Sequence, residues 1–211
     1  GDLARQARLR MLYLLNDRRD EALKPVDSPS PAMREFWSKQ LSALATLTDP
    51  ASTAECEGRK AEAKKHLAAA VEKLGESCPL LVENLAFATE IELFGRYRPF
   101  DKYEFEPGQK VLLYAELENF QSRKTCRGFH TGTLSSYQIF DSRGRRVAEH
   151  EFAPSEEHCP APRRDYFIGY EFNLPAGISP GKHVLQLTVA DQNSEKIGQA
   201  MIEFTVRSSD H

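Results

Sequence analysis

The chain has 211 residues, of which 40% are hydrophobic and 28% charged, and its formal net charge is −3. This composition is typical of a globular protein and excludes a disordered chain, while the length suffices for one large domain or two small ones. Residues 1–78 carry a net charge of +1 and residues 79–211 of −4. Neither part is basic enough to predict nucleic-acid binding, and no apolar run approaches the roughly 20 residues that span a bilayer.

The first predicted helix covers residues 2–23, because leucines recur there at helical spacing with arginines between them. It ends at Lys24-Pro25, since the residue before a proline avoids the helical region. A second helix starts at Ser30-Pro31, an N-cap followed by proline at the first helical position. Asp49-Pro50 stops it, and its apolar face is formed by Trp37, Leu41, Leu44 and Thr48.

A third helix is predicted to open at residues 52–55, where Ser-Thr-Ala-Glu forms a capping box. Leu67, Val71 and Leu74 form its apolar stripe, and Gly75 is placed to be its C-cap. Three helices joined by short loops predict a small helical bundle over residues 1–77.

After Cys78-Pro79 the hydrophobic period changes from that of a helix to two, which is the period of a strand. The clearest stretch is Tyr103–Phe120, where a Pro107-Gly108 turn precedes a strand at residues 109–120. One face of that strand is apolar and the other is mixed, as in an antiparallel sheet with one wet side. The apolar face consists of Val111, Leu113, Ala115 and Leu117.

Further alternating segments follow along the chain with turn signals between them. Residues 121–129 and 153–164 are expected to be polar loops, and Asp141–Gly144 a hairpin turn. The expected strands lie near residues 85–93, 131–140, 146–152, 166–174, 183–189 and 200–206. Seven or eight strands in this pattern predict an antiparallel sandwich of the immunoglobulin or fibronectin-III kind over residues 79–211. The fold class is therefore α+β, in two modules.

The segment Leu174-Pro175, Ser179-Pro180-Gly181-Lys182-His183, and on to Val189 and Asp191, resembles the last hairpin of bacterial extracytoplasmic immunoglobulin-like modules. Those modules often carry tyrosine where His183 stands. Over most of its length the chain resembles a bacterial family with a helical head and such a β tail. The resemblance implies an architecture and brings no known activity with it.

Two segments expected to be loops each offer one cysteine and one histidine, namely Cys126 with His130 and His158 with Cys159. Thiolate and imidazole are zinc ligands, so a metal site is one interpretation. A Cys126–Cys159 disulfide is another, and two free thiols are a third. A Cys–His nucleophile would use the same residues, although no family signature surrounds either cysteine. No C-x-x-C occurs, and no cofactor is predicted.

Aromatic and basic residues between the first two strands could form a binding surface, and arginines at the 141–146 hairpin could add to it. The interpretation that competes with an exposed platform is a hydrophobic plug between the two modules. The predicted surface comprises Arg96, Tyr97, Arg98, Phe100, Tyr103, Arg143, Arg145 and Arg146.

These patterns favour a non-enzymatic interaction module of the bacterial cell envelope, with a protein or an envelope polymer as partner. The chain starts with Gly1 and shows no signal peptide, which fits a periplasmic, secreted or anchored protein whose leader is absent; a cytoplasmic location stays open. The alternatives are a metal- or thiol-dependent enzyme that uses the 121–130 and 153–165 loops, and a carbohydrate-binding module that uses the aromatics at 97–105.

Overall fold

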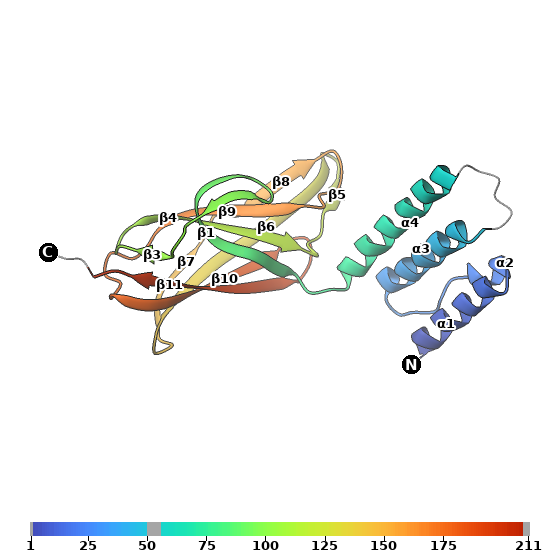
Figure 1. The fold of residues 1–211 in the computed structure, drawn as a ribbon, viewed down its shortest axis with the longest axis horizontal. Helices are drawn as coiled ribbons and strands as arrows, with labels where there is room; N and C mark the ends of the chain where they lie inside the picture. Colours follow the sequence, from blue (N-terminus) through green and yellow to red (C-terminus); the bar gives the residue numbers. More distant parts are fainter. Residues whose placement is uncertain (1, 50–55, 209–211) are drawn as a thin grey trace. The chain divides into compact units, whose positions relative to one another are not determined.

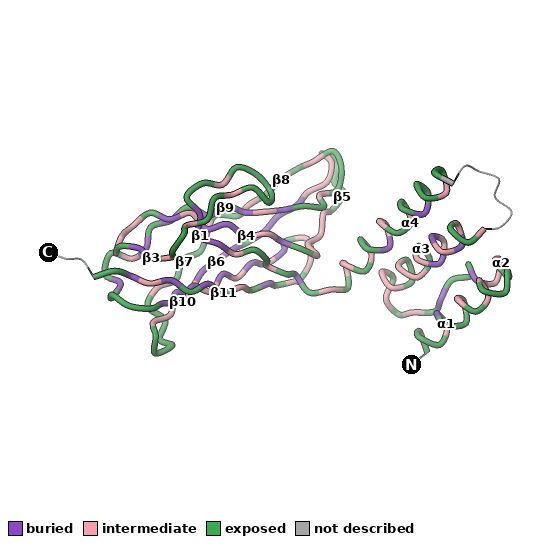
Figure 2. Tube along the Cα trace, in the orientation of Figure 1, coloured by how far each residue is buried: buried purple, intermediate pink, exposed green. Residues whose placement is uncertain are grey.

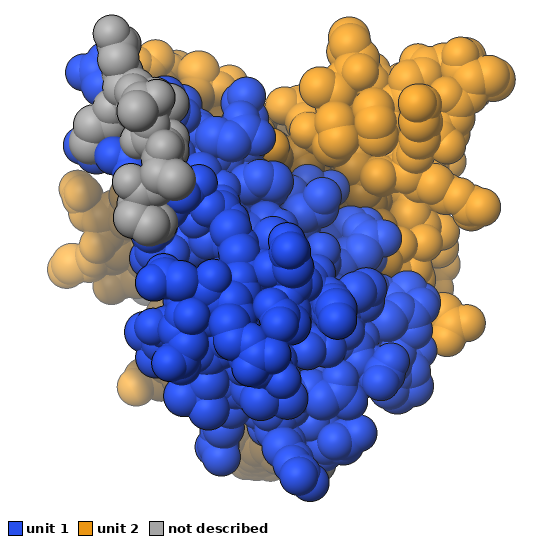
Figure 3. Space-filling view, turned by 90° about the vertical axis from the view of Figure 1, so that its right-hand side faces the viewer, with its two compact units in different colours: residues 1–78 blue, residues 79–211 orange. Residues whose placement is uncertain are grey.

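The structure, a computed structural model, describes residues 2–49 and 56–208. The chain divides into two compact units, residues 1–78 and residues 79–211, which Figure 3 shows in different colours. Each unit is described by itself. The architecture is α+β, with four helices and eleven strands among the described residues (Figure 1). No helix in the described ranges is long and apolar enough to cross a membrane.

Unit 1 consists of α1 (Asp2–Leu15), α2 (Arg19–Ala22), α3 (Pro31–Leu47) and α4 (Cys56–Glu76). The expectation of one helix over residues 2–23 is wrong. Asp17 adopts a left-handed backbone with φ of 56°, and Arg18 N donates to Tyr13 O at 2.9 Å. This closure ends α1, because a left-handed residue after the last turn redirects the chain.

The start of α3 is confirmed, since the Ser30 hydroxyl accepts a hydrogen bond from Met33 N at 3.3 Å and Pro31 is the first helical residue. The predicted stop at Asp49-Pro50 and the capping box at 52–55 reach residues outside the described ranges. Gly75 does not cap α4, which runs on to Glu76.

The apolar stripe predicted for α4 does not form its buried face. Ala63 and Ala70, seven positions apart, are each 1% exposed, whereas Val71 is 70% exposed. Leu67 and Leu74 are also exposed. Small alanine side chains let two helices approach closely, so the alanine row makes the contact with α3 and the larger residues flank it.

Unit 2 contains two sheets. One has the order β2-β1-β4-β9, with β1 (Leu81–Leu93), β2 (Arg96–Pro99), β4 (Lys110–Glu118) and β9 (Tyr166–Asn173). The other has the order β3-β11-β10-β6-β5, with β7 and β8 also paired to β6. Its strands are β3 (Glu104–Phe105), β5 (Arg123–Thr125), β6 (Gly128–Asp141), β7 (Arg146–Glu151), β8 (Ser155–Cys159), β10 (Gly181–Asp191) and β11 (Ile197–Val206). All strand pairs are antiparallel except β3 with β11.

The two sheets enclose one hydrophobic core, visible as the buried segments of Figure 2. Phe87 of the first sheet is 0% exposed and contacts Phe204 of the second with ring centroids 5.6 Å apart. The predicted apolar face of β4 is confirmed, because its four residues are all buried in this core. The Pro107-Gly108 turn is confirmed too, with Gly108 at φ of 76°.

The simple alternation expected for residues 85–93 fails after Ala88. Phe87 points into the core, but the register of β1 shifts between Ala88 and Glu90. A bulge inserts one extra residue and exchanges the two faces of a strand. Ile91 therefore lies against Gly169 on the outer face, 3.2 Å from the position that a Cβ would take there.

Candidate functional site

Strand β6 is longer than predicted and gathers the sequence-predicted site residues at one end of unit 2. It begins at Gly128, and its first residues pair with β5 through Arg123↔His130 and with β8 through His130↔His158. Both segments expected to be loops thus contain short strands. The His130 and His158 rings lie side by side, with centroids 5.0 Å apart.

The pleat of β8 separates Cys159 from this histidine pair. Neighbouring residues in a strand point to opposite faces, so Cys159 and His158 cannot turn to one ion together. Cys126 is exposed in the turn between β5 and β6. Among the described residues, no three histidine, cysteine or carboxylate side chains gather in an arrangement that could hold a metal ion. The predicted four-residue metal set is therefore not assembled.

Cys159 lies beside a carboxylate and an arginine. The Arg163 guanidinium forms a fork with Glu157 at 2.8–3.0 Å. Partial burial, together with Glu157, raises the pKa of the Cys159 thiol. A raised pKa reduces the thiolate fraction at neutral pH, which is the reverse of what a nucleophilic cysteine needs.

Cys126 and Cys159 are free thiols in the structure, as is Cys78. The predicted Cys126–Cys159 disulfide is not formed there, and the pairing in solution stays a prediction. The turn that holds Cys126 approaches Cys159 closely: a Cβ on Gly128 would lie 2.5 Å from Cys159 O. Glycine is required at this point by that contact and by its φ of 109°.

The β10–β11 turn locks this end of the unit. Asn193 Nδ2 donates to the backbone oxygens of Gln121 and His130, each at 2.9 Å. Asp191, 4% exposed, accepts from Gln121 N at 2.8 Å and from Ser194 Oγ at 2.7 Å. These bonds join the β4–β5 loop, the start of β6 and the β10–β11 turn, so the strands that carry the histidine pair sit on a fixed frame.

The aromatic residues at 97–105 do not form one exposed platform. Phe105 is 0% exposed and lies 4.9 Å from the Phe87 ring, and Phe100 and Tyr103 pack against the same core. These three rings are therefore part of the core of unit 2, and a plug between the two modules stays a prediction. Tyr97 lies on the outer face instead, stacked on Tyr114 at 4.1 Å.

The Tyr114 hydroxyl donates to Glu116 at 2.6 Å and accepts from Gly95 N at 2.7 Å. Burial and then the Glu116 carboxylate raise the pKa of Tyr114 to about 12. The stack of Tyr97 on this fully buried ring therefore secures β2 to β4.

Most of the predicted basic surface is occupied by ion pairs. Arg96 pairs with Glu92 and Arg98 with Glu90. At the β6–β7 hairpin, Arg145 pairs with Asp141 at 2.8 Å and Arg146 with Glu149 at 2.7 Å. The hairpin turn itself is confirmed, since Arg143 N and Arg145 N both donate to Asp141 Oδ1.

Lys102, Arg143 and Lys182 make no ion pair with any described residue and lie at separate points of unit 2. Four further cations without such a pair are grouped together: Arg123, Lys124, Arg127 and Arg164. Three lie on β5 and the turn after it, and Arg164 follows Arg163, whose backbone N–H bonds Ser122 Oγ at 3.4 Å. We call these four residues the basic loop end. The signal for it in the sequence was three cations in five positions, 123–127, with no acidic residue among them.

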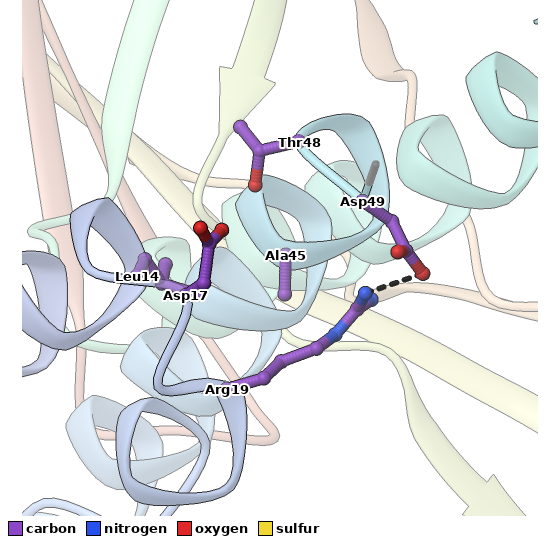
Figure 4. Close-up of a pocket in the computed structure, with 6 residues that line it drawn as sticks. All are labelled: Leu14, Asp17, Arg19, Ala45, Thr48 and Asp49. Carbon is purple, nitrogen blue, oxygen red and sulfur yellow. Dashed lines mark ion pairs between the residues drawn. The ribbon is translucent and has the colours of Figure 1, made fainter. Parts of the chain in front are cut away.

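A small cavity of about 180 Å³ lies in unit 1, between the end of α1, α2 and the end of α3 (Figure 4). An ion pair between Arg19 and Asp49 crosses it. Pockets that take drug-sized ligands usually have roughly 300–1,000 Å³, so this one is too small for such a molecule. Its lining is Leu14, Asp17, Arg19, Ala45, Thr48 and Asp49.

Comparison with known proteins assigns no family. No protein-family model matches the sequence, and no curated protein is similar to it. Among solved structures, the chain is similar to the alkylpurine DNA glycosylase AlkC of Pseudomonas fluorescens bound to DNA containing an abasic site analog, with 13% identity over 96% of this chain and 54% of that one, and a TM-score of 0.35.

It is also similar to Spo0M, a sporulation control protein of Bacillus subtilis, with 8% identity over 62% of this chain and 50% of that one, and a TM-score of 0.36. The chain thus spans about half the length of each. Scores this low support no argument about function.

Proposed function

We propose that this protein is a non-enzymatic binding module of the bacterial cell envelope, and that its basic loop end binds an acidic envelope polymer. In this proposal unit 2 is an immunoglobulin-like sandwich, and α1, α3 and α4 form a three-helix bundle. Two facing sheets with a shared core support the first assignment, and the packing of α3 on both α1 and α4 supports the second.

The observation that carries the proposal is the grouping of unpaired cations at one end of unit 2, whereas Lys102, Arg143 and Lys182 are unpaired singly. Elsewhere on unit 2, arginines such as Arg96 and Arg146 already have carboxylate partners. Arg123, Lys124 and Arg127 have none among the described residues, although they are exposed within five positions of each other. Cations without an internal partner keep their full charge for an anionic ligand.

The hydrogen bonds of Asn193 and Asp191 favour binding by this surface. They fix the loops that flank β5, so little conformational entropy is lost when a ligand binds. Catalysis by the neighbouring thiol is disfavoured by its raised pKa. A binding role therefore fits this end of the unit better than catalysis by Cys159 does.

The test is retention of the whole chain on an immobilised acidic polymer, such as dextran sulfate, during a salt gradient. The triple variant R123S/K124S/R127S should elute at a clearly lower salt concentration than the unmodified protein, because screened contacts with a polyanion weaken as cations are removed. The control R96S/R98S/R146S removes the same charge from ion-paired positions and should elute close to the unmodified protein.

Equal losses in both triple variants would show a response to net charge alone and would contradict the proposal. An unmodified protein that is not retained at low salt would contradict it as well.

A further inference from the structure

We infer that His130 and His158 form a two-histidine site for a divalent first-row transition metal such as Zn²⁺. The two residues are directly opposite each other on β6 and β8, and their rings are 5.0 Å apart between centroids. Two imidazoles on one face of a sheet can bind one ion as a chelate, because the paired strands hold the two residues next to each other before the ion arrives.

The hydrogen bonds of Asn193 determine which nitrogen of His130 is available. Asn193 Nδ2 donates to two carbonyl oxygens, those of Gln121 and His130, so that atom must be the amide nitrogen. The other atom, Oδ1, is then an acceptor, and it lies 3.1 Å from His130 Nδ1. In the neutral imidazole, Nδ1 therefore carries the proton and Nε2 keeps its lone pair.

Metal-binding histidines commonly have this arrangement. The ring nitrogen that does not bind the metal donates its N–H to an oxygen, which fixes the ring orientation and the tautomer. The oxygen comes from the β10–β11 turn, whereas the ring is carried by β6. The orientation of His130 is therefore independent of the ion, which reduces the cost of binding it.

Gly132 leaves space beside the same nitrogen. A Cβ at this position would lie 3.1 Å from His130 Nε2 and 2.3 Å from Gln192 Oε1. No other residue could occupy the position without displacing one of them. The missing side chain therefore leaves room for the His130 ring and the Gln192 amide, which both lie beside this backbone position.

The charged neighbours of the pair act in opposite directions. Arg123 of β5 lies opposite His130 of β6 on the same face of the sheet, so the positive charge of Arg123 weakens cation binding. Glu156 of β8 lies opposite Gly132 of β6 and on the same face as His158, so the negative charge of Glu156 strengthens cation binding. The two ligands are imidazoles, and no carboxylate joins them in a group of three potential ligands among the described residues. The site therefore suits an ion that prefers nitrogen, such as Zn²⁺, rather than Mg²⁺ or Ca²⁺.

The test uses the whole chain, freed of metal by a chelator, and ZnCl₂ as the probe in isothermal titration calorimetry. H158A and H130A should each weaken Zn²⁺ binding about tenfold or more, since ligands and the groups that orient them change affinity by such factors. H158A is the key variant, because His158 is exposed and its loss leaves the core untouched. H66A, which removes an imidazole from unit 1, is the control and should bind as the unmodified protein does.

Nitrogen-15 NMR of the imidazoles supplies a second readout. Addition of Zn²⁺ should shift the Nε2 resonance of His130 while its Nδ1 stays protonated. Zn²⁺ binding that is equally tight in H158A and in the unmodified protein would overturn the inference. So would binding lost in C126S and kept in H158A, because the exposed thiol would then be the ligand.

Discussion

Replacement of Asn193 by alanine tests the frame on which both proposals rest. The side chain makes three hydrogen bonds, two from Nδ2 to carbonyl oxygens at 2.9 Å and one from His130 Nδ1 at 3.1 Å. It therefore connects the β10–β11 turn with the β4–β5 loop and with the start of β6. Asp191, by comparison, bonds the β4–β5 loop through Gln121 N.

The expected loss follows from these bonds. A typical intramolecular hydrogen bond contributes about 0.5–1.5 kcal/mol net. The groups here are half-buried, so water can replace part of each bond and the lower half of that range applies. N193A should therefore lower the free energy of unfolding of unit 2 by about 2 kcal/mol. With a urea dependence of about 2 kcal/mol per molar, the midpoint should fall by about 1 M.

Urea denaturation followed by far-ultraviolet circular dichroism measures this change. The only tryptophan, Trp37, lies on α3, so its fluorescence reports on unit 1 separately and should not respond. N173A, the same substitution at an exposed position, is the matched control. A loss below about 0.5 kcal/mol for N193A, equal to that of N173A, would refute the argument that this amide holds the loops together.

Three further outcomes follow from the packing of unit 2. F87A should cost about 3–5 kcal/mol in a denaturation experiment, because the ring is fully buried among Tyr103, Phe105 and Phe204; a loss under 1 kcal/mol would contradict the packing. Stability should fall as the pH rises from about 10 to about 12, because the folded state holds the Tyr114 proton more tightly than the unfolded state, and Y114F should reduce this fall. H183F should keep or raise the melting temperature, since His183 Nε2 is buried without a partner among the described residues, and a clear loss would show that the Nδ1 bond to Gly181 O matters more.

The sequence alone determined the elements whose hydrophobic period is long and regular. The alternation at Val111, Leu113, Ala115 and Leu117 predicted the buried face of β4, because burial of one face is a property of the strand itself. The turn at Asp141–Gly144 was also predictable, since the Asp141 carboxylate accepts from the backbone N–H of Arg143 and Gly144 supplies a φ of 74°.

Local signals failed where one extra residue or one unusual dihedral changed the outcome. The bulge after Ala88 turned Ile91 to the outer face, and the left-handed Asp17 ended α1 early. On α4 the sequence showed an apolar stripe, but the close approach of α3 selected the alanine row. The bulge, the helix end and the buried face of α4 all depend on how neighbouring elements pack, and the hydrophobic period of the sequence carries no information about that packing.

The histidine pair depended wholly on the tertiary structure. His130 and His158 are separated by 27 intervening residues, and each lay in a segment with no strand signal of its own. They are brought together because β6 extends to Gly128 and offers β5 and β8 a hydrogen-bonding partner. A strand as short as β5 or β8 is stable only when it pairs with a neighbouring strand. The sequence therefore shows which residues can bind a metal, but only the pairing of the strands determines that His130 and His158 share a face.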